Sequence, residues 1–307
     1  MATTTSKSTK KKTASKATKK PAVKSATRTS RAAAGTTKKT VSAKAPKATS
    51  KSISTGAQSG ITQLQVISLV LSAALATAAA VLMNTQAYQL VKGMLAKNEL
   101  ASASDAALVP AVTHVIDLEL RWAVVGVMAT SAVLSLIMLT VYKNRYSAAV
   151  KARVNGLRWA EIAITSALMV EVVALLSGIN DIFVLKVIAG LVIVTCALGW
   201  VSEKRNLQAN RTVKSELMIS VLTGALPWLL ILGYAASTYI HGRVTSPWYV
   251  YALYAVLIVG FTGYCLALKG FVYRRFTDYT VLERRQLLIG ILTKVAFASI
   301  LIAALFK

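Results

Sequence analysis

The sequence predicts an all-α membrane protein built from seven transmembrane helices. Three observations support this fold class: 55% of the 307 residues are hydrophobic, these residues gather in seven long blocks, and the connecting loops differ in positive charge. A helix rises about 1.5 Å per residue, so about twenty apolar residues are enough to cross a bilayer. Each of the seven blocks reaches that length.

Residues 1–60 come first and are a low-complexity mixture of Lys, Ala, Ser, Thr and Pro. They contain fifteen lysines and arginines and no acidic residue, which accounts for more than half of the formal net charge of +25. This composition cannot bury a core, so we expect a disordered cytoplasmic tail. Its charge favours contact with anionic lipid. Nucleic acid is the less favoured partner, because no aromatic side chain is interleaved for base stacking.

The seven apolar blocks define a membrane domain at residues 61–307. They cover residues 61–83, 122–142, 157–178, 181–201, 216–237, 248–269 and 286–306. Pro227 lies inside the fifth block, where a membrane helix tolerates it with a kink. Cys196 and Cys265 also lie within blocks, so we interpret them as small core residues without a disulfide.

The loop charges predict the orientation of the helices. Three loops are rich in lysine and arginine: Lys143, Arg145, Lys151 and Arg153 follow the second block, Lys204, Arg205, Arg211 and Lys214 follow the fourth, and Arg274, Arg275, Arg284 and Arg285 follow the sixth. The loops on the other side hold fewer positive charges. Because cytoplasmic loops have the excess of Lys and Arg, we expect a cytoplasmic N-terminus and an extracellular C-terminus.

One extracellular loop, residues 84–120, is too long for a simple connector, so we expect it to have a structure or function of its own. It contains His114, and His241 lies in another loop on the same side. No cysteine or carboxylate spacing supports a metal site at these two histidines, and we predict none.

Four ionisable residues fall inside the blocks, where an uncompensated charge is costly: Glu161, Glu171, Lys186 and Lys294. Glu171 and Lys186 lie at a similar depth on adjacent antiparallel helices. We therefore predict that these two side chains form a structural ion pair.

Lys294, near the middle of the last block, requires either a buried carboxylate partner or conversion to an imine with a bound aldehyde. Glu161 is the carboxylate that remains once Glu171 is assigned to Lys186. Arg158 competes for Glu161, because residues i and i+3 share one helix face. Lys294 would then line a water-filled cavity, and the residues alone leave both arrangements open.

Ordered motifs on six helices resemble those of heliorhodopsins, microbial-type rhodopsins with a cytoplasmic N-terminus. The segment RWAEIAITSALM, from Arg158 to Met169, is similar to the family pattern RWxEYxxSAxxM. Five further strings, GINDIFVL, GWVSE, GALPW, PWYVYAL and FTDYTVLE, resemble GxxD, FGxxME, AGxxPW, PxFVYxI and WxDYxxGE. The spacing from Glu283 to Lys294 also matches the family, and the similarity extends from about residue 110 onward.

This resemblance implies a rhodopsin-like bundle that acts as a light-sensing photoreceptor and is neither an enzyme nor an ion pump. It implies all-trans retinal bound covalently to Lys294 as a protonated Schiff base, with Glu161 as the counterion. The expected retinal contacts are Met169, Trp228 and Phe261, and the expected polar network is Arg158, Ser135 and Glu283. Heliorhodopsins are generally dimeric, so the resemblance also implies a homodimer.

The chain departs from the family at several positions around the expected linkage. Ser135 replaces a histidine, Ile162 a tyrosine and Gly290 a serine, the first block has no histidine, and Glu171 and Lys186 stand at apolar positions. We expect these changes to leave fewer hydrogen bonds around the chromophore. The alternative function is a retinal-free transporter or channel that uses Glu161 and Lys294 as an intramembrane charge pair.

Overall fold

The computed structural model describes residues 55–97, 108–208, 214–242, 245–273 and 278–306. Most of the expected tail, residues 1–60, therefore lies outside the described residues. The same is true of Arg211, Arg274 and Arg275, which belong to the charge pattern that predicts the orientation.

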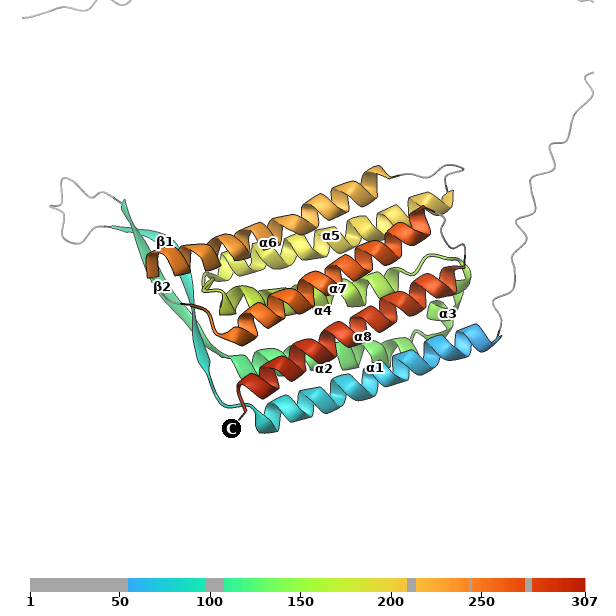
Figure 1. Ribbon diagram of the computed structural model, residues 1–307, viewed down its shortest axis with the longest axis horizontal. Coiled ribbons are helices and arrows are strands. Elements are labelled where there is room, and N and C mark those ends of the chain that lie inside the picture. Colours follow the sequence, from blue (N-terminus) through green and yellow to red (C-terminus); the bar gives the residue numbers. More distant parts are fainter. Residues whose placement is uncertain (1–54, 98–107, 209–213, 243–244, 274–277, 307) are drawn as a thin grey trace, which may run out of the picture. The chain divides into compact units, whose positions relative to one another are not determined.

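The described residues form helices and one β-hairpin (Figure 1). The elements in chain order are α1 (Thr55–Leu82), β1 (Ala87–Lys97), β2 (Leu108–Glu119), α2 (Leu120–Leu139), α3 (Lys143–Lys151), α4 (Gly156–Leu176), α5 (Ile182–Gln208), α6 (Ser215–Gly242), α7 (Trp248–Val272) and α8 (Tyr279–Ala304). All except α3 and the strands are long and apolar enough to cross a membrane. These seven helices confirm the seven predicted spans.

The last helix begins earlier than the sequence predicts. It starts at Tyr279, because the Asp278 carboxylate caps it by accepting a hydrogen bond from the backbone N–H of Thr280 at 2.9 Å. Glu283 therefore belongs to the last helix, although it precedes the predicted block at residues 286–306. It lies in the second turn of α8, where its side chain is fully buried. Hydropathy alone located only the apolar part of this helix.

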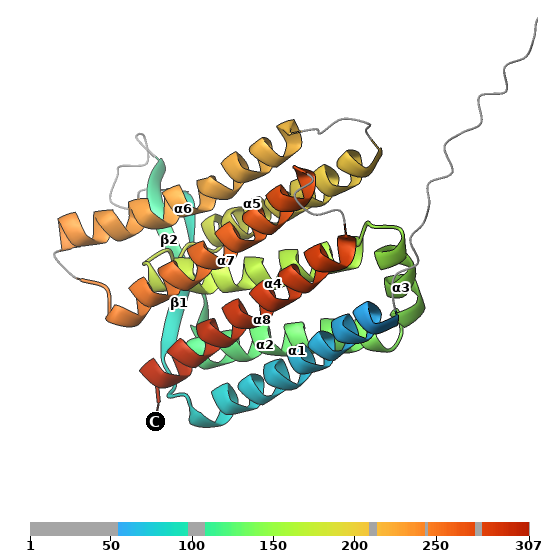
Figure 2. The ribbon, with the colours of Figure 1, turned by 45° about the vertical axis from the view of Figure 1, so that its right-hand side comes forward.

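The helices pack as neighbours around the central helix α4, which is the most deeply buried span (Figures 1 and 2). α1 packs against both α2 and α8, and α5 packs between α4 and α6. The largest hydrophobic cluster joins residues from several of these helices, including Met128, Val173, Ile188 and Phe297. Because α4 contacts α2, α5 and α7, its polar side chains are shielded on several sides.

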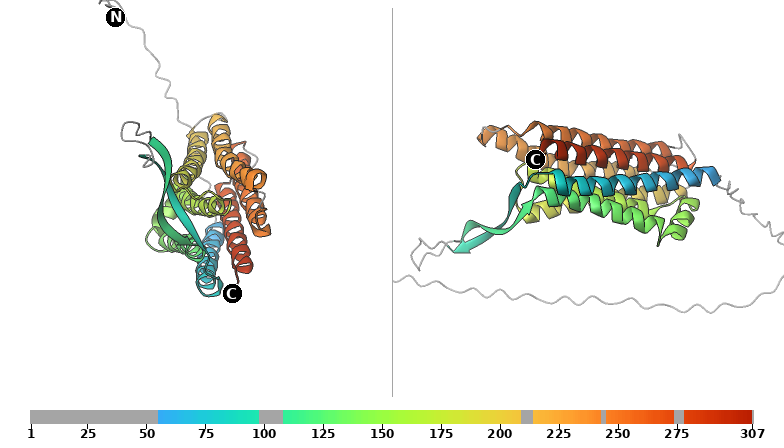
Figure 3. Two further views of the ribbon diagram at one scale, coloured as in Figure 1. Left: turned by 90° about the vertical axis from the view of Figure 1, so that its left-hand side faces the viewer. Right: turned by 90° about the horizontal axis from the view of Figure 1, so that it is seen from below.

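The long loop forms the antiparallel hairpin β1–β2 at one end of the bundle (Figure 3). Two hydrogen bonds attach it to the start of α5: Val91 N–H donates to the Asn180 carbonyl at 2.9 Å, and Gly93 N–H donates to Asp181 Oδ2 at 2.9 Å. Asp181 also accepts hydrogen bonds from the backbone N–H groups of Phe183 and Val184. Hydrogen bonds from these backbone groups, with Gly93 first, hold the pKa of Asp181 below its usual range.

The opposite end of the bundle holds the short helix α3, which the sequence did not predict (Figure 1). It is polar and only nine residues long, so no apolar block marks it. Tyr146 and Val150 are nevertheless buried against the ends of the spanning helices. This helix thereby adds a phenol to the interior of the bundle.

Candidate functional site

The side chain of Lys294 on α8 is buried between α1, α2 and α4. Its ammonium donates hydrogen bonds to Glu161 Oε1 at 2.9 Å and to Ser131 Oγ at 2.7 Å. The Lys294 and Glu161 side chains are only 6% and 4% exposed. The charge that is expensive in the middle of a membrane helix therefore has a buried carboxylate beside it.

Arg158 lies one turn before Glu161 on α4 and binds the same carboxylate. Its Nη1 pairs with Glu161 Oε2, while Lys294 takes Oε1. The Arg158 Nε also donates to Glu283 Oε1 at 3.0 Å. Both pairings of Glu161 considered from the sequence thus occur together, because one carboxylate has two oxygens to share, and Lys294 is paired with Glu161 instead of lining a water-filled cavity.

Glu283 forms the second carboxylate of this network. Its Oε1 accepts hydrogen bonds from Arg158, from Asn155 Nδ2 at 3.0 Å, and from the hydroxyl of Tyr146 on α3. Burial raises the pKa of Tyr146 well above its usual range, so the phenol stays protonated and donates. Asn155 and Tyr146 therefore belong to the polar network together with the predicted Arg158 and Glu283.

A third buried carboxylate, Glu203 on α5, lies beside this network. It accepts hydrogen bonds from Trp159 Nε1 at 2.7 Å, from the Tyr279 hydroxyl at 2.9 Å and from the Asn155 backbone N–H at 3.2 Å. Asn155 thus touches both Glu203 and Glu283. A continuous set of buried polar groups therefore extends from Lys294 to the α3 end of the bundle.

On the α1–α2 side, serines provide the polar contacts. Ser131 accepts a hydrogen bond from Lys294 and another from Ser72 at 3.1 Å. Ser135, the residue predicted for the polar network, lies one turn away and bonds to Ser68 at 3.5 Å. The described hydrogen bonds therefore place Ser131, rather than Ser135, next to Lys294.

The predicted apolar contacts Met169, Trp228 and Phe261 belong to one cluster. The rings of Trp228 and Phe261 meet edge to face, with centroids 6.4 Å apart. A cavity of about 30 Å³ adjoins Phe261 and is also lined by Tyr264. The three residues thus come together from α4, α6 and α7.

Gly290, one turn before Lys294, brings this aromatic region close to the buried lysine. A Cβ at that position would lie 2.7 Å from the Tyr264 hydroxyl oxygen and 4.0 Å from Lys294 Cε. Glycine is therefore what allows the Tyr264 phenol to approach this turn of α8. The sequence showed the glycine as a departure from the family pattern but not its partner.

Glu171 and Lys186 form a separate pair toward the hairpin end, with Lys186 Nζ 2.7 Å from Glu171 Oε1. Lys186 is 66% exposed and Glu171 is 15% exposed, so this pair lies at the edge of the bundle. The two histidines have local partners: His114 bonds to Asp117 at 2.9 Å, and His241 bonds to the Ser237 carbonyl at 3.1 Å.

Comparison with known proteins yields one family and one fold. The family model described as Heliorhodopsin matches residues 61–305. The crystal structure of the transmembrane domain of a rhodopsin phosphodiesterase from Salpingoeca rosetta is similar over 80% of this chain and 84% of its own, with 14% identity and a TM-score of 0.53. That similarity shows a rhodopsin-like fold alone. No curated protein sequence matches the chain.

Proposed function

This chain belongs to the heliorhodopsin family, and on that premise we propose that it is a light-sensing photoreceptor with all-trans retinal bound to Lys294. The family implies a retinal-binding rhodopsin in the membrane, generally without enzymatic activity. The finer part of the proposal is a protonated Schiff base at Lys294 with Glu161 as its counterion. One observation supports it above all others, the 2.9 Å contact between the buried Lys294 ammonium and Glu161.

The residues around Lys294 fit this chromophore in their chemistry. A buried amine is the group that condenses with an aldehyde, and a buried carboxylate balances the positive charge that remains on the nitrogen. Met169, Trp228 and Phe261 supply the apolar and aromatic surface that a polyene requires. The cavity beside Phe261 measures about 30 Å³, so binding also requires side chains such as Tyr264 to rotate. Bound retinal would supply the absorption of visible light.

Arg158 and Glu283 have a positioning role in this proposal. Arg158 fixes one oxygen of Glu161, so that the other oxygen faces Lys294. Glu283 in turn balances the charge of Arg158, which would otherwise compete fully for Glu161. Any change in charge at Lys294 is therefore transmitted through Glu161 and Arg158 to Glu283 and Tyr146.

We do not assign ion pumping to the protein. A pump requires a second carboxylate on the far side of Lys294, and the candidate there, Glu171, is held by Lys186. The buried carboxylates Glu203 and Glu283 both lie toward the α3 end, on the same side as Arg158. This one-sided arrangement favours a sensor.

The remaining parts of the proposal concern the whole chain in the cell membrane. We place the α3 end and the tail, residues 1–60, in the cytoplasm, where the tail contacts anionic lipid. The membrane domain, residues 61–307, forms a homodimer. Trypsin added to sealed inside-out vesicles should remove the tail. Cleavage only in right-side-out vesicles would show that the N-terminus is extracellular and would contradict this orientation.

Expression with all-trans retinal tests the photoreceptor proposal directly. The purified protein should show a visible absorption band that is lost in Lys294→Ala and retained in the matched variant Lys186→Ala. A retinal-free transporter or channel would show no band, and its Glu161–Lys294 pair would act only as a charge pair. A band that survives Lys294→Ala would contradict the proposal.

A further inference from the structure

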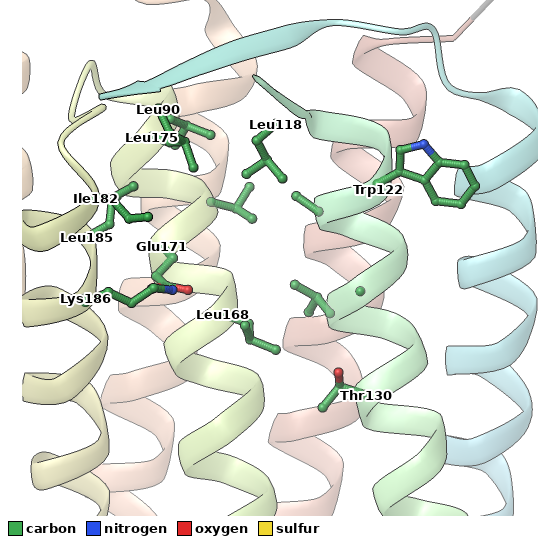
Figure 4. Close-up of a pocket in the computed structure, with 14 residues that line it drawn as sticks. Leu90, Leu118, Trp122, Thr130, Leu168, Glu171, Leu175, Ile182, Leu185 and Lys186 are labelled. Carbon is green, nitrogen blue, oxygen red and sulfur yellow. The ribbon is translucent and has the colours of Figure 1, made fainter. Parts of the chain in front are cut away.

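A second cavity lies beneath the hairpin, between α2, α4 and α5 (Figure 4). It measures about 290 Å³, close to the lower limit of typical ligand pockets. Its wall is mostly apolar, with Leu90 and Leu118 above it and Leu168, Val172 and Leu175 along α4. Its lining residues include neither of the described hydrogen-bond partners of Lys294, Glu161 and Ser131, so it is distinct from the proposed chromophore site.

The polar groups on this wall are mainly those of the Glu171–Lys186 pair, whose side chains meet in Figure 4. Within the part of the chain that the structure describes, the Lys186 ammonium donates to Glu171 Oε1 and to no other group. Two of its three N–H groups and the second carboxylate oxygen are therefore available. Because Lys186 is 66% exposed, an incoming molecule can reach them.

We propose that this cavity binds the hydroxyl-bearing end of a neutral lipophilic molecule. The ion pair has no net charge but presents a donor next to an acceptor. A hydroxyl group can accept a hydrogen bond from Lys186 and donate one to Glu171 at the same time. A carboxylate or ammonium head would be attracted by one member of the pair and repelled by the other, so it would give up its hydration without a net electrostatic gain. The volume suits the end of a chain or one ring, while the rest of the molecule lies against the apolar helices.

Gly126 on α2 explains why there is room for such a molecule. It lines the cavity, and a Cβ at this position would meet no atom within 4 Å. A large side chain there would fill the cavity without clashing with the backbone. Gly190 on α5 is a matched control, because a Cβ there also meets nothing within 4 Å and it does not line the cavity.

Energy transfer from tryptophan to a conjugated octadecatetraene probe tests the proposal, since Trp122 lies at the cavity rim. The full-length protein in nanodiscs is titrated with three probes that share one tail and end in a hydroxyl, a carboxylate or a methyl group. The alcohol should bind at least tenfold more tightly than the other two. Equal binding of alcohol and hydrocarbon, or tightest binding of the acid, would overturn the proposal.

Three variants then locate the binding site. Gly126→Phe should abolish saturable binding of all three probes, whereas Gly190→Phe should bind as the native chain does. The double variant Glu171→Met/Lys186→Met should lose the preference for the alcohol and still bind the hydrocarbon. Circular dichroism confirms that each variant is folded. Retention of alcohol binding in Gly126→Phe, or of its preference in the double variant, would refute the assignment.

Discussion

A carboxylate oxygen of Glu161 on α4 lies 2.9 Å from the ammonium nitrogen of Lys294 on α8. The other oxygen of Glu161 is bound by Arg158. One oxygen of Glu161 therefore balances the charge of Lys294, and the other anchors the carboxylate to Arg158.

Glu161→Gln should shift the visible band to longer wavelength. The carboxylate stabilises a positive charge on the Lys294 nitrogen, and at 4 Å two unit charges interact by about 4 kcal/mol at an effective dielectric constant of 20. A neutral amide at position 161 would provide little of that stabilisation. The absorption spectrum with retinal measures the shift. Glu171→Gln on the same helix should leave the band in place, and an unchanged spectrum in Glu161→Gln would point to another counterion.

Arg158→Ala should destabilise the protein far more than an arginine change at the edge of the bundle. Arg158 is 3% exposed and pairs with Glu161 and with the fully buried Glu283. Removing one partner of a buried pair costs about 3–5 kcal/mol. Arg205→Ala breaks a pair with Glu216 in which the arginine is 60% exposed, and should cost about 1 kcal/mol or less.

Denaturant unfolding of both variants in the same detergent compares these costs. Similar losses in Arg158→Ala and Arg205→Ala would show that the inner network contributes little to stability.

Gly290→Ser should destabilise α8. Its Cβ would lie 2.7 Å from the Tyr264 hydroxyl, and such overpacking costs about 1–3 kcal/mol. In a Tyr264→Phe background the cost should fall below about 1 kcal/mol, since the clashing oxygen is gone. Thermal unfolding of the single and double variants measures this rescue. Equal costs in both backgrounds would mean that Tyr264 does not restrict this position.

Glu171 and Lys186 should couple energetically as a structural pair. Polar contacts between membrane helices contribute about 0.6 kcal/mol on average and up to about 1.7 kcal/mol. A double-mutant cycle with Glu171→Gln and Lys186→Met should give a coupling in that range. Additive effects of the two changes would leave this pair without a structural role.

The apolar parts of the fold follow from the sequence, because seven blocks of spanning length leave few alternatives. The polar ends of the helices cannot be predicted from the sequence in this way. The start of α8 contains Asp278 and Glu283, whose charges are typical of a loop until a helix cap and a buried network account for them. The helix α3 is too short and polar to give a hydropathy signal.

Similar limits apply to the site. Glu161 and Lys294 could be identified from their cost in a membrane helix and from the family motifs. Ser131 could not be separated from Ser135, since both lie on the same face of α2 and only the packing of α8 decides between them. Tyr146 and Glu203 join the network through the packing of α3 and α5, which no spacing in the sequence reveals.

The most direct test of the central claim is to locate the retinal attachment by mass spectrometry. The protein is purified with all-trans retinal, reduced with borohydride to trap an imine as a stable amine, and digested. The account predicts a retinyl group on the peptide that contains Lys294 and none on the peptide that contains Lys186. A retinyl group on another lysine, or a visible band without any trapped adduct, would contradict it.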